Sequence, residues 1–100
     1  MSYLLVDMGD PEAMGSLIKR LRFMQGMTQR DLAGRLGINQ TRLSNIEGGR
    51  ARTATPTFVR IIAAMGHQAL VAVQIDTQEE MADGVMRMDV EPYNDEVPAR

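Results

Sequence analysis

Two short amphipathic segments that meet at Gly37 constrain the fold of this chain more than any other feature. Thr28 begins the first segment as a helix cap, with Asp31 as its capping-box partner, and Asn39 begins the second. Gly37 ends the first helix, because glycine accepts the left-handed backbone of a helix stop. Inward apolar positions recur at helical spacing: Leu32, Ala33 and Leu36, then Leu43 and Ile46. The sequence thus predicts two short helices across a tight glycine turn.

A longer helix is predicted before this pair, from Pro11 to about Gln25. The Asp10 side chain can cap it, proline suits the first helical position, and Gly26 ends it. Gly15 inside this helix costs about 1 kcal/mol relative to alanine. The apolar residues of this helix should form one buried stripe: Met14, Leu17, Ile18, Leu21 and Met24. The basic residues Lys19, Arg20 and Arg22 should point away from that stripe.

A fourth helix is predicted after a basic loop. Thr55 is its cap, Pro56 follows, and Gly66 closes it. Its core stripe consists of Phe58, Ile61, Ile62 and Met65. After His67 the pattern changes to a short β-branched run over residues 69–75, which predicts a strand. The fold class is therefore mainly α, a bundle of four or five helices with one C-terminal β-strand.

The predicted strand needs a partner, because unpaired backbone groups make a lone strand unstable. The same strand of a second copy is the simplest partner, and antiparallel pairing across a two-fold axis would make a homodimer. The pairing residues would be Leu70, Val71, Ala72, Val73 and Ile75. Pairing with residues 4–6 is the main alternative, and the apolar run over residues 3–6 could itself be a strand or a loose arm.

Charge divides the chain into zones. The formal charge is −3 over residues 1–15, +7 over residues 16–75 and −6 over residues 76–100. A basic middle suits phosphate neutralisation, although ordinary surface charge for solubility is the alternative. We divide the chain into an N-terminal arm (1–10), a basic helical domain that is the candidate for DNA binding (11–66), a dimerisation strand (67–76) and an acidic tail (77–100), which is expected to be partly or wholly disordered.

Composition argues against several function classes. The chain has no cysteine and a single histidine, so neither a disulfide framework nor a metal cluster is expected, and we expect no cofactor. Residues 1–14 lack the basic start and the apolar stretch of a signal peptide, and the sequence has no apolar run of membrane-spanning length. We therefore expect no membrane partner and a cytoplasmic location, on the nucleoid when bound to DNA. With no paired nucleophile and base and no phosphate loop, an enzyme is the last candidate.

The third predicted helix carries the residues that could read DNA. In a helix, glycine turn and helix arrangement, the later helix projects into a major groove about 12 Å wide. Its exposed Gln40, Thr41 and Asn45 are the candidate base readers, since glutamine and asparagine can pair with adenine and the threonine methyl with thymine. Candidate contacts to the DNA backbone are Gln29, Arg30, Arg42, Ser44, Arg50 and Arg52.

Residues 27–50 resemble the lambda-repressor-like (Cro/CI, XRE) helix-turn-helix family. The similarity rests on Thr28-Gln29, Leu32-Ala33, Leu36-Gly37-Ile38, Gln40, Leu43-Ser44 and Glu47-Gly48 at the family's spacing, and it extends over residues 12–66. The resemblance implies a lambda-repressor-like bundle and binding of double-stranded operator DNA. It also implies that Gln40 and Thr41 are the main base readers. The N-terminal arm and the acidic tail depart from the family pattern.

A narrower resemblance is to HipB-type antitoxins, through Pro11, the threonine-rich loop before Phe58 and the trailing strand. It implies a dimer that represses its own operon and holds a HipA-like toxin kinase. A stand-alone repressor without a toxin is the second hypothesis, and an interaction module that has lost DNA binding is the third. The presence of a neighbouring gene for a HipA-like kinase separates the first two hypotheses.

The sequence leaves the roles of several other residues open. His67 follows a helix end, where a structural role is expected. Met14, Met24 and Met65 fit helix stripes as core residues, whereas Met81, Met86 and Met88 suggest a partner-binding face in the tail. Glu47 is expected at the core edge rather than as an acid catalyst. Arg30 and Arg35 could be solvated charges, and the acidic tail could be solvated or could engage a basic toxin groove.

Overall fold

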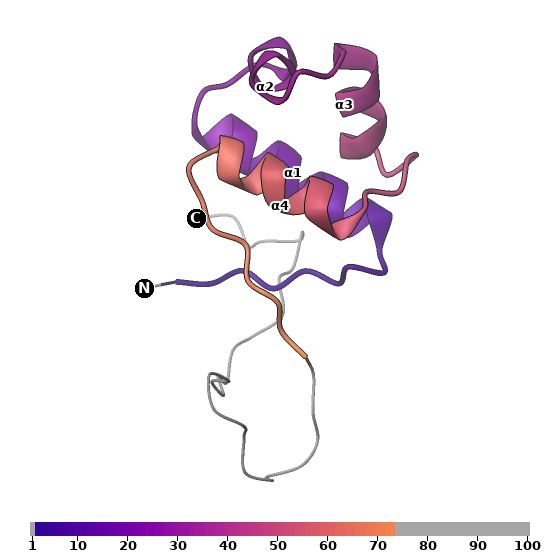
Figure 1. Cartoon of the computed structure of the whole chain (residues 1–100), viewed down its shortest axis with the longest axis vertical. Coiled ribbons are helices and arrows are strands. Elements are labelled where there is room, and N and C mark those ends of the chain that lie inside the picture. Colours follow the sequence, from indigo (N-terminus) through magenta and orange to yellow (C-terminus); the bar gives the residue numbers. More distant parts are fainter. Residues whose placement is uncertain (1, 74–100) are drawn as a thin grey trace, which may run out of the picture.

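The computed structural model describes residues 2–73, which form four helices and their connecting segments. They are α1 (Pro11–Met24), α2 (Gln29–Leu36), α3 (Gln40–Glu47) and α4 (Thr55–Ala64). Figure 1 shows α2 and α3 at one end of the molecule, above a layer formed by α1 and α4. Helix α3 packs against α1 and α2, and α2 also packs against α4. The expected helical bundle with its pair of short helices is therefore confirmed.

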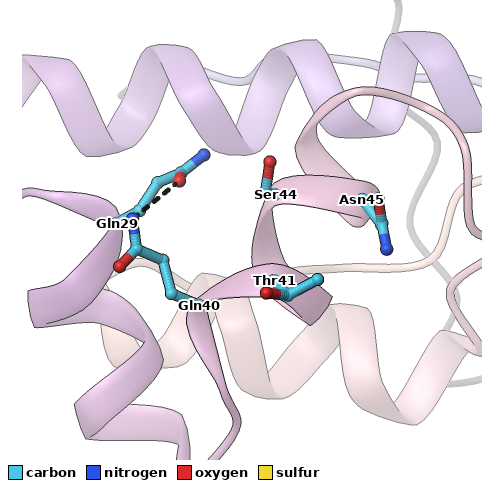
Figure 2. A pocket seen from close by; sticks show the side chains of 5 residues that line it. All are labelled: Gln29, Gln40, Thr41, Ser44 and Asn45. Atoms are coloured by element: carbon cyan, nitrogen blue, oxygen red, sulfur yellow. Dashed lines mark hydrogen bonds between the residues drawn. The ribbon is translucent and has the colours of Figure 1, made fainter.

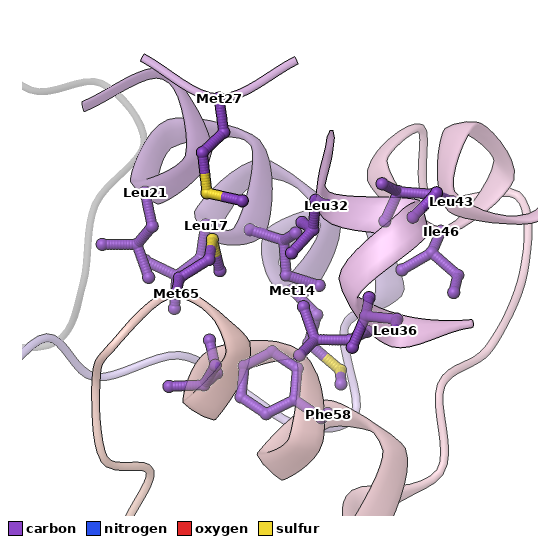
Figure 3. Packing of buried hydrophobic residues seen from close by; sticks show 14 residues of the cluster. Met14, Leu17, Leu21, Met27, Leu32, Leu36, Leu43, Ile46, Phe58 and Met65 are labelled. Atoms are coloured by element: carbon purple, nitrogen blue, oxygen red, sulfur yellow. The ribbon is translucent and has the colours of Figure 1, made fainter. Parts of the chain in front are cut away.

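One apolar core joins the four helices (Figure 3). Its largest fully buried side chains are Ile18, Leu32, Leu43, Ile61 and Met65, so each helix or its end contributes. The other buried apolar residues are Met14, Leu17, Leu21, Met27, Ala33, Leu36, Ile46, Phe58 and Ile62. Because the two short helices are held by this shared core, their relative orientation does not depend on the Gly37 turn alone.

Side-chain caps start three of the helices as the sequence predicts. Asp10 accepts a hydrogen bond from the Ala13 backbone at 3.1 Å, and Asn39 accepts one from the backbone of α3 at 2.7 Å. Helix α4 differs, because Ala54 occupies the cap position without a side-chain hydrogen bond. Thr55 is the first helical residue rather than the cap. Prolines are tolerated throughout the first helical turn, so Pro56 fits the observed start as well as the predicted one.

The capping box of α2 makes the stability of the fold decrease at acidic pH. The Thr28 hydroxyl accepts from the Asp31 backbone at 3.0 Å, and the Asp31 carboxylate accepts from the Thr28 backbone at 3.0 Å. The backbone hydrogen bond from Thr28 lowers the pKa of Asp31 below its ordinary value. A depressed folded-state pKa gives stability that is present above the unfolded-state pKa and lost as pH falls through the folded-state value. We expect Asp31→Asn to flatten the decline in melting temperature below pH 4, measured by thermal unfolding from pH 5 to pH 2.5; an unchanged decline would contradict this role.

Two residues of α1 differ from the predicted stripe. Met24 is 73% exposed rather than part of the core, because an apolar stripe buries a side chain only where another element covers it. Arg22 is buried rather than pointing away with Lys19, since it meets a carboxylate from α3. The role of Met14 and Met65 as core residues is confirmed.

The segments flanking the helices have no β-strand within residues 2–73. Residues 2–6 run as an irregular arm whose Val6 packs against the core, so a strand there is not observed. Leu70, Val71 and Val73 are 59%, 84% and 77% exposed. The rest of the predicted strand, including Ile75, and the acidic tail lie outside the described residues, so the strand and its pairing remain predictions. None of the described helices is long and apolar enough to cross a membrane.

Candidate nucleic-acid interface

Five polar residues predicted to contact DNA line one shallow hollow of about 270 Å³. They are Gln29 from the start of α2 and Gln40, Thr41, Ser44 and Asn45 from α3 (Figure 2). Gln40 and Thr41 are exposed, whereas the other three are half-buried. The structure thus brings together the three candidate base readers and two of the candidate backbone contacts. This surface offers hydrogen-bond donors and acceptors from amides and hydroxyls, as base edges require.

A chain of hydrogen bonds orients the two glutamines of the hollow. The Gln40 amide Nε2 donates to Gln29 Oε1 at 3.4 Å, as Figure 2 shows by a dashed line. The Gln29 amide Nε2 donates in turn to Glu47 Oε1 at 3.1 Å. This partnership fixes which end of the Gln29 amide faces Gln40. Gln40 therefore presents its own carbonyl oxygen and one remaining N–H to a ligand.

A buried ion pair anchors that chain of hydrogen bonds. Arg22 donates from Nε and Nη2 to the two carboxylate oxygens of Glu47, both at 2.8 Å, and from Nη1 to the Met27 carbonyl at 2.9 Å. The side chains are only 6% and 3% exposed. The hydrogen bond to Glu47 raises the pKa of Arg22 above its ordinary value. Glu47 is therefore a buried structural residue, as its expected place at the core edge implied, and its link to Gln29 was not foreseen.

Arg50 binds the C-terminal half of α3. Its Nε donates to Asn45 Oδ1 at 3.1 Å, and its Nη2 donates to the Ser44 carbonyl at 3.1 Å. The guanidinium group lies against Gly48, where any β-carbon would approach Nη1 to 2.3 Å. Arg50 uses one acceptor site of Asn45 Oδ1 and orients the amide, so that its N–H groups are offered to a ligand. The second lone pair of that oxygen can still accept from a ligand, as bidentate pairing of Asn45 with adenine requires.

A second hollow of about 170 Å³ adjoins the first and includes Lys19, which the sequence does not single out as a DNA contact. Lys19 of α1 lines it, with Gln29, Ser44, Glu47, Gly48 and Arg50. From the sequence, Lys19 was assigned only to the polar side of α1. The pattern of one helix does not show which other helix lies next to that side. Its position beside Arg50 adds a second cation next to the polar hollow, and cations in such places bind phosphate.

The other basic residues of α2, α3, α4 and the loop before α4 lie outside the two hollows. Arg30, Arg42 and Arg52 are exposed but line neither hollow. Arg35 donates to the Ala64 carbonyl and Arg60 to the Leu36 carbonyl, both at 3.2 Å, so each caps the end of the other's helix. The basic charge of residues 16–75 is therefore not all directed at one ligand. In the described part of the chain, no group of three or more histidine or acidic residues could hold a metal ion.

The family model of a helix-turn-helix domain matches residues 15–70. The chain belongs to this helix-turn-helix family. Over 55 residues, which are 55% of the chain, it is 33% identical to Antitoxin HipB of Escherichia coli. That helix-turn-helix match spans 58% of the HipB protein's length.

Solved structures with a similar helix-turn-helix fold include the clp gene regulator ClgR of Corynebacterium glutamicum. One ClgR structure matches with a TM-score of 0.56 and 28% identity, over 58% of this chain and 62% of that one. A second matches with a TM-score of 0.57 and 24% identity, over 67% and 83% of the two chains. The predicted resemblance to helix-turn-helix regulators and to HipB is thus confirmed.

Proposed function

We propose that this chain is a sequence-specific DNA-binding transcriptional regulator that reads an operator with α3. The observation that carries this proposal is the hollow where Gln40 and Thr41 stand exposed at the start of α3, beside Gln29 and flanked by Lys19 and Arg50. The exposed amides and the threonine side chain, with its hydroxyl and methyl groups, can contact base edges in the major groove. The flanking cations can contact phosphates.

In this proposal Gln40, Thr41 and Asn45 contact bases. Gln40 pairs with adenine, the Thr41 methyl contacts a thymine methyl, and the Asn45 amide donates to an acceptor such as guanine N7. The backbone contacts are Gln29, Arg30, Arg42, Ser44, Arg50 and Arg52, to which the structure leads us to add Lys19. Backbone contacts set the register of the protein on the duplex, and base contacts choose the sequence.

The proposed repressor acts as a homodimer through residues 70–75, and the domain boundaries at residues 10, 66 and 76 separate arm, DNA-binding domain, strand and tail. A two-fold dimer would place two recognition helices about 34 Å apart in successive major grooves of a near-palindromic operator. Bound there, it would block RNA polymerase. Support comes from the apolar side chains of Leu70, Val71 and Val73, which are exposed in the single chain.

The more specific proposal is a HipB-like antitoxin that represses its own operon and neutralises a HipA-like toxin kinase. The 33% identity to Antitoxin HipB supports it. The similarity to the clp gene regulator ClgR favours the second candidate, a stand-alone regulator without a toxin partner. Neither candidate is an enzyme. A HipA-like kinase encoded next to this gene, and inhibited by the purified protein, would support the first; its absence would leave the second.

Selection from a pool of randomised duplexes tests the proposed DNA binding without knowledge of the operator. We expect the full chain to enrich a motif with two half-sites one helical turn apart. Recovery of duplexes without any shared motif would contradict sequence-specific binding.

Substitutions on α3 should separate base reading from backbone binding. We expect Gln40→Ala to cost about 1 to 3 kcal/mol on the selected duplex and to relax the base preference at its position. Arg42→Ala should weaken binding to all duplexes evenly. It should also reduce by about one the slope of the logarithm of the association constant against the logarithm of the salt concentration. Both residues are exposed, so neither change should affect folding. Fluorescence anisotropy on selected and scrambled duplexes measures the difference, and a uniform loss for Gln40→Ala would contradict its assignment.

Charged substitutions after α4 should prevent the proposed dimer. Val71→Lys combined with Val73→Lys places two like charges on the pairing strand, and lysine at a strand edge disfavours pairing. Because both valines are largely exposed in the single chain, the helical domain should stay folded. We expect analytical ultracentrifugation to show a dimer for the wild type and a monomer for this variant. A variant that still sediments as a dimer would refute the assigned interface.

A further inference from the structure

The C-terminal end of α1 carries an exposed apolar patch flanked by positive charge. Phe23 and Met24 are 63% and 73% exposed. Lys19 Nζ lies 5.8 Å from the centroid of the Phe23 ring, and the Arg22 guanidinium carbon lies 4.7 Å from it. We call Lys19, Phe23 and Met24 the α1-end patch. Arg22 is already paired with Glu47, so the exposed cation beside these apolar side chains is Lys19. Such a surface suits a partner segment that combines acidic and apolar residues.

The chain leaves the helical domain next to this patch. Gln25, which follows Met24, donates from Nε2 to the Met65 carbonyl, and its Nε2 lies 3.1 Å from His67 Nε2. The ends of α1 and α4 therefore meet, and the following residues start there (Figure 1). The stretch from His67 to Met81 can span about 45 Å when extended, so it can also return to the patch. Tethering of this kind gives a local concentration on the order of millimolar.

The sequence beyond residue 75 has the chemistry that the α1-end patch requires. Residues 76–91 carry six acidic residues and one basic residue, and three methionines stand among them: Met81, Met86 and Met88. Methionine adapts to aromatic and irregular apolar surfaces. We propose that residues 76–91 of the same chain dock on the α1-end patch, with the methionines against Phe23 and Met24 and the carboxylates toward Lys19.

Docking would oppose DNA binding, because Lys19 also lines the hollow with Gln29 and Arg50. A carboxylate held by Lys19 takes the place of a DNA phosphate. This consequence rests on the proposed function, whereas docking itself does not. The coupling between two sites is typically a few kcal/mol, so the docked segment should weaken DNA binding about tenfold.

Docking can be measured in the full chain without DNA. The chain has no cysteine, so Met86→Cys creates one site for a nitroxide spin label. We expect paramagnetic broadening of the backbone amide signals of residues 19–24 and none around Gly37. The same label in a Phe23→Ser, Met24→Ser variant is the matched control, in which the broadening should disappear. Equal broadening with and without these serines would overturn the proposal. The proposal would also be overturned if the broadening arose only in a mixture, from the spin label on one copy of the chain to an isotope-labelled second copy, because the contact would then be between chains.

The effect on DNA binding is measured on the duplex selected with the wild type. Replacing the acidic residues of 76–91 by their amides should raise affinity about tenfold in the wild-type background. In the Phe23→Ser, Met24→Ser background the same replacement should change affinity much less. An equal gain in both backgrounds would assign the effect to overall charge and overturn the competition at the patch. If no variant binds DNA, the proposed function fails, while the spin-label result still decides the docking.

Discussion

Gly15→Ala is expected to lower the free energy of unfolding by about 3 kcal/mol, although alanine is the better helix former by about 1 kcal/mol. Helix α1 crosses the end of α3 at this glycine. A β-carbon there would lie 2.3 Å from the Ile46 carbonyl oxygen and 2.6 Å from that of Glu47. These are backbone atoms, which cannot swing aside as a side-chain end can. The two helices would have to separate, and that strains the core and the hollow of α3 together.

Gly34→Ala provides the matched control for this prediction. Gly34 also lies inside a helix, but a β-carbon there would meet nothing within 4 Å. We expect this variant to gain up to about 1 kcal/mol from helix propensity. In thermal unfolding, Gly15→Ala should lower the melting temperature by about 15 °C and Gly34→Ala should raise it slightly. Similar melting temperatures for the two variants would show that α1 and α3 do not approach as closely as described.

Arg22→Met is expected to cost about 3 to 5 kcal/mol, because it leaves the Glu47 carboxylate buried without its cation. Arg22 supplies two hydrogen bonds to that carboxylate and one to the Met27 carbonyl. For a domain whose total stability is about 5 to 15 kcal/mol, this loss brings the chain close to unfolding. Urea denaturation of the wild type and the variant at neutral pH measures it. A loss below about 1 kcal/mol would mean that water reaches the pair.

The double variant Arg22→Met, Glu47→Met separates the cost of an unpaired charge from the value of the pair. Replacing both partners with apolar residues of similar length is often nearly neutral, so we expect most of the stability to return. The double variant also removes the acceptor of the Gln29 amide. We therefore expect it to fold while binding the operator more weakly, since Gln29 no longer holds Gln40 in one orientation. Unchanged operator affinity would assign Glu47 a purely structural role.

The sequence predicted those parts of the fold that depend on neighbouring residues. The boundaries of the two short helices follow from Thr28, Gly37 and Asn39, whose cap or turn chemistry acts within a few residues. The hollow formed by Gln40 and its neighbours was also predictable, because the side of a helix opposite Leu43 and Ile46 must face outward.

Residues that act over long distances were missed. Arg22 meets Glu47 twenty-five positions later, and no local pattern distinguishes it from the exposed Lys19. From the sequence, Gly15 was predicted only to lower the stability of its own helix. The reason for a glycine there is the close approach of the α3 backbone, which the sequence of α1 does not show. Met24 fits the stripe by spacing, but burial depends on which element covers it. Each error concerns which second element a side chain meets, and a single periodic pattern does not contain that information.

The central claim is that the α3 face reads a specific DNA sequence. A salt titration of binding to duplex DNA from upstream of the gene, compared with scrambled duplex, tests it most directly in the wild type and in Gln40→Ala. We expect the wild type to prefer the upstream duplex strongly, and Gln40→Ala to lose that preference. The logarithm of the association constant should fall linearly with the logarithm of the salt concentration, with a slope of about −0.9 for each phosphate contacted. Equally weak binding of the wild type to both duplexes would contradict the account and assign this surface to a protein partner.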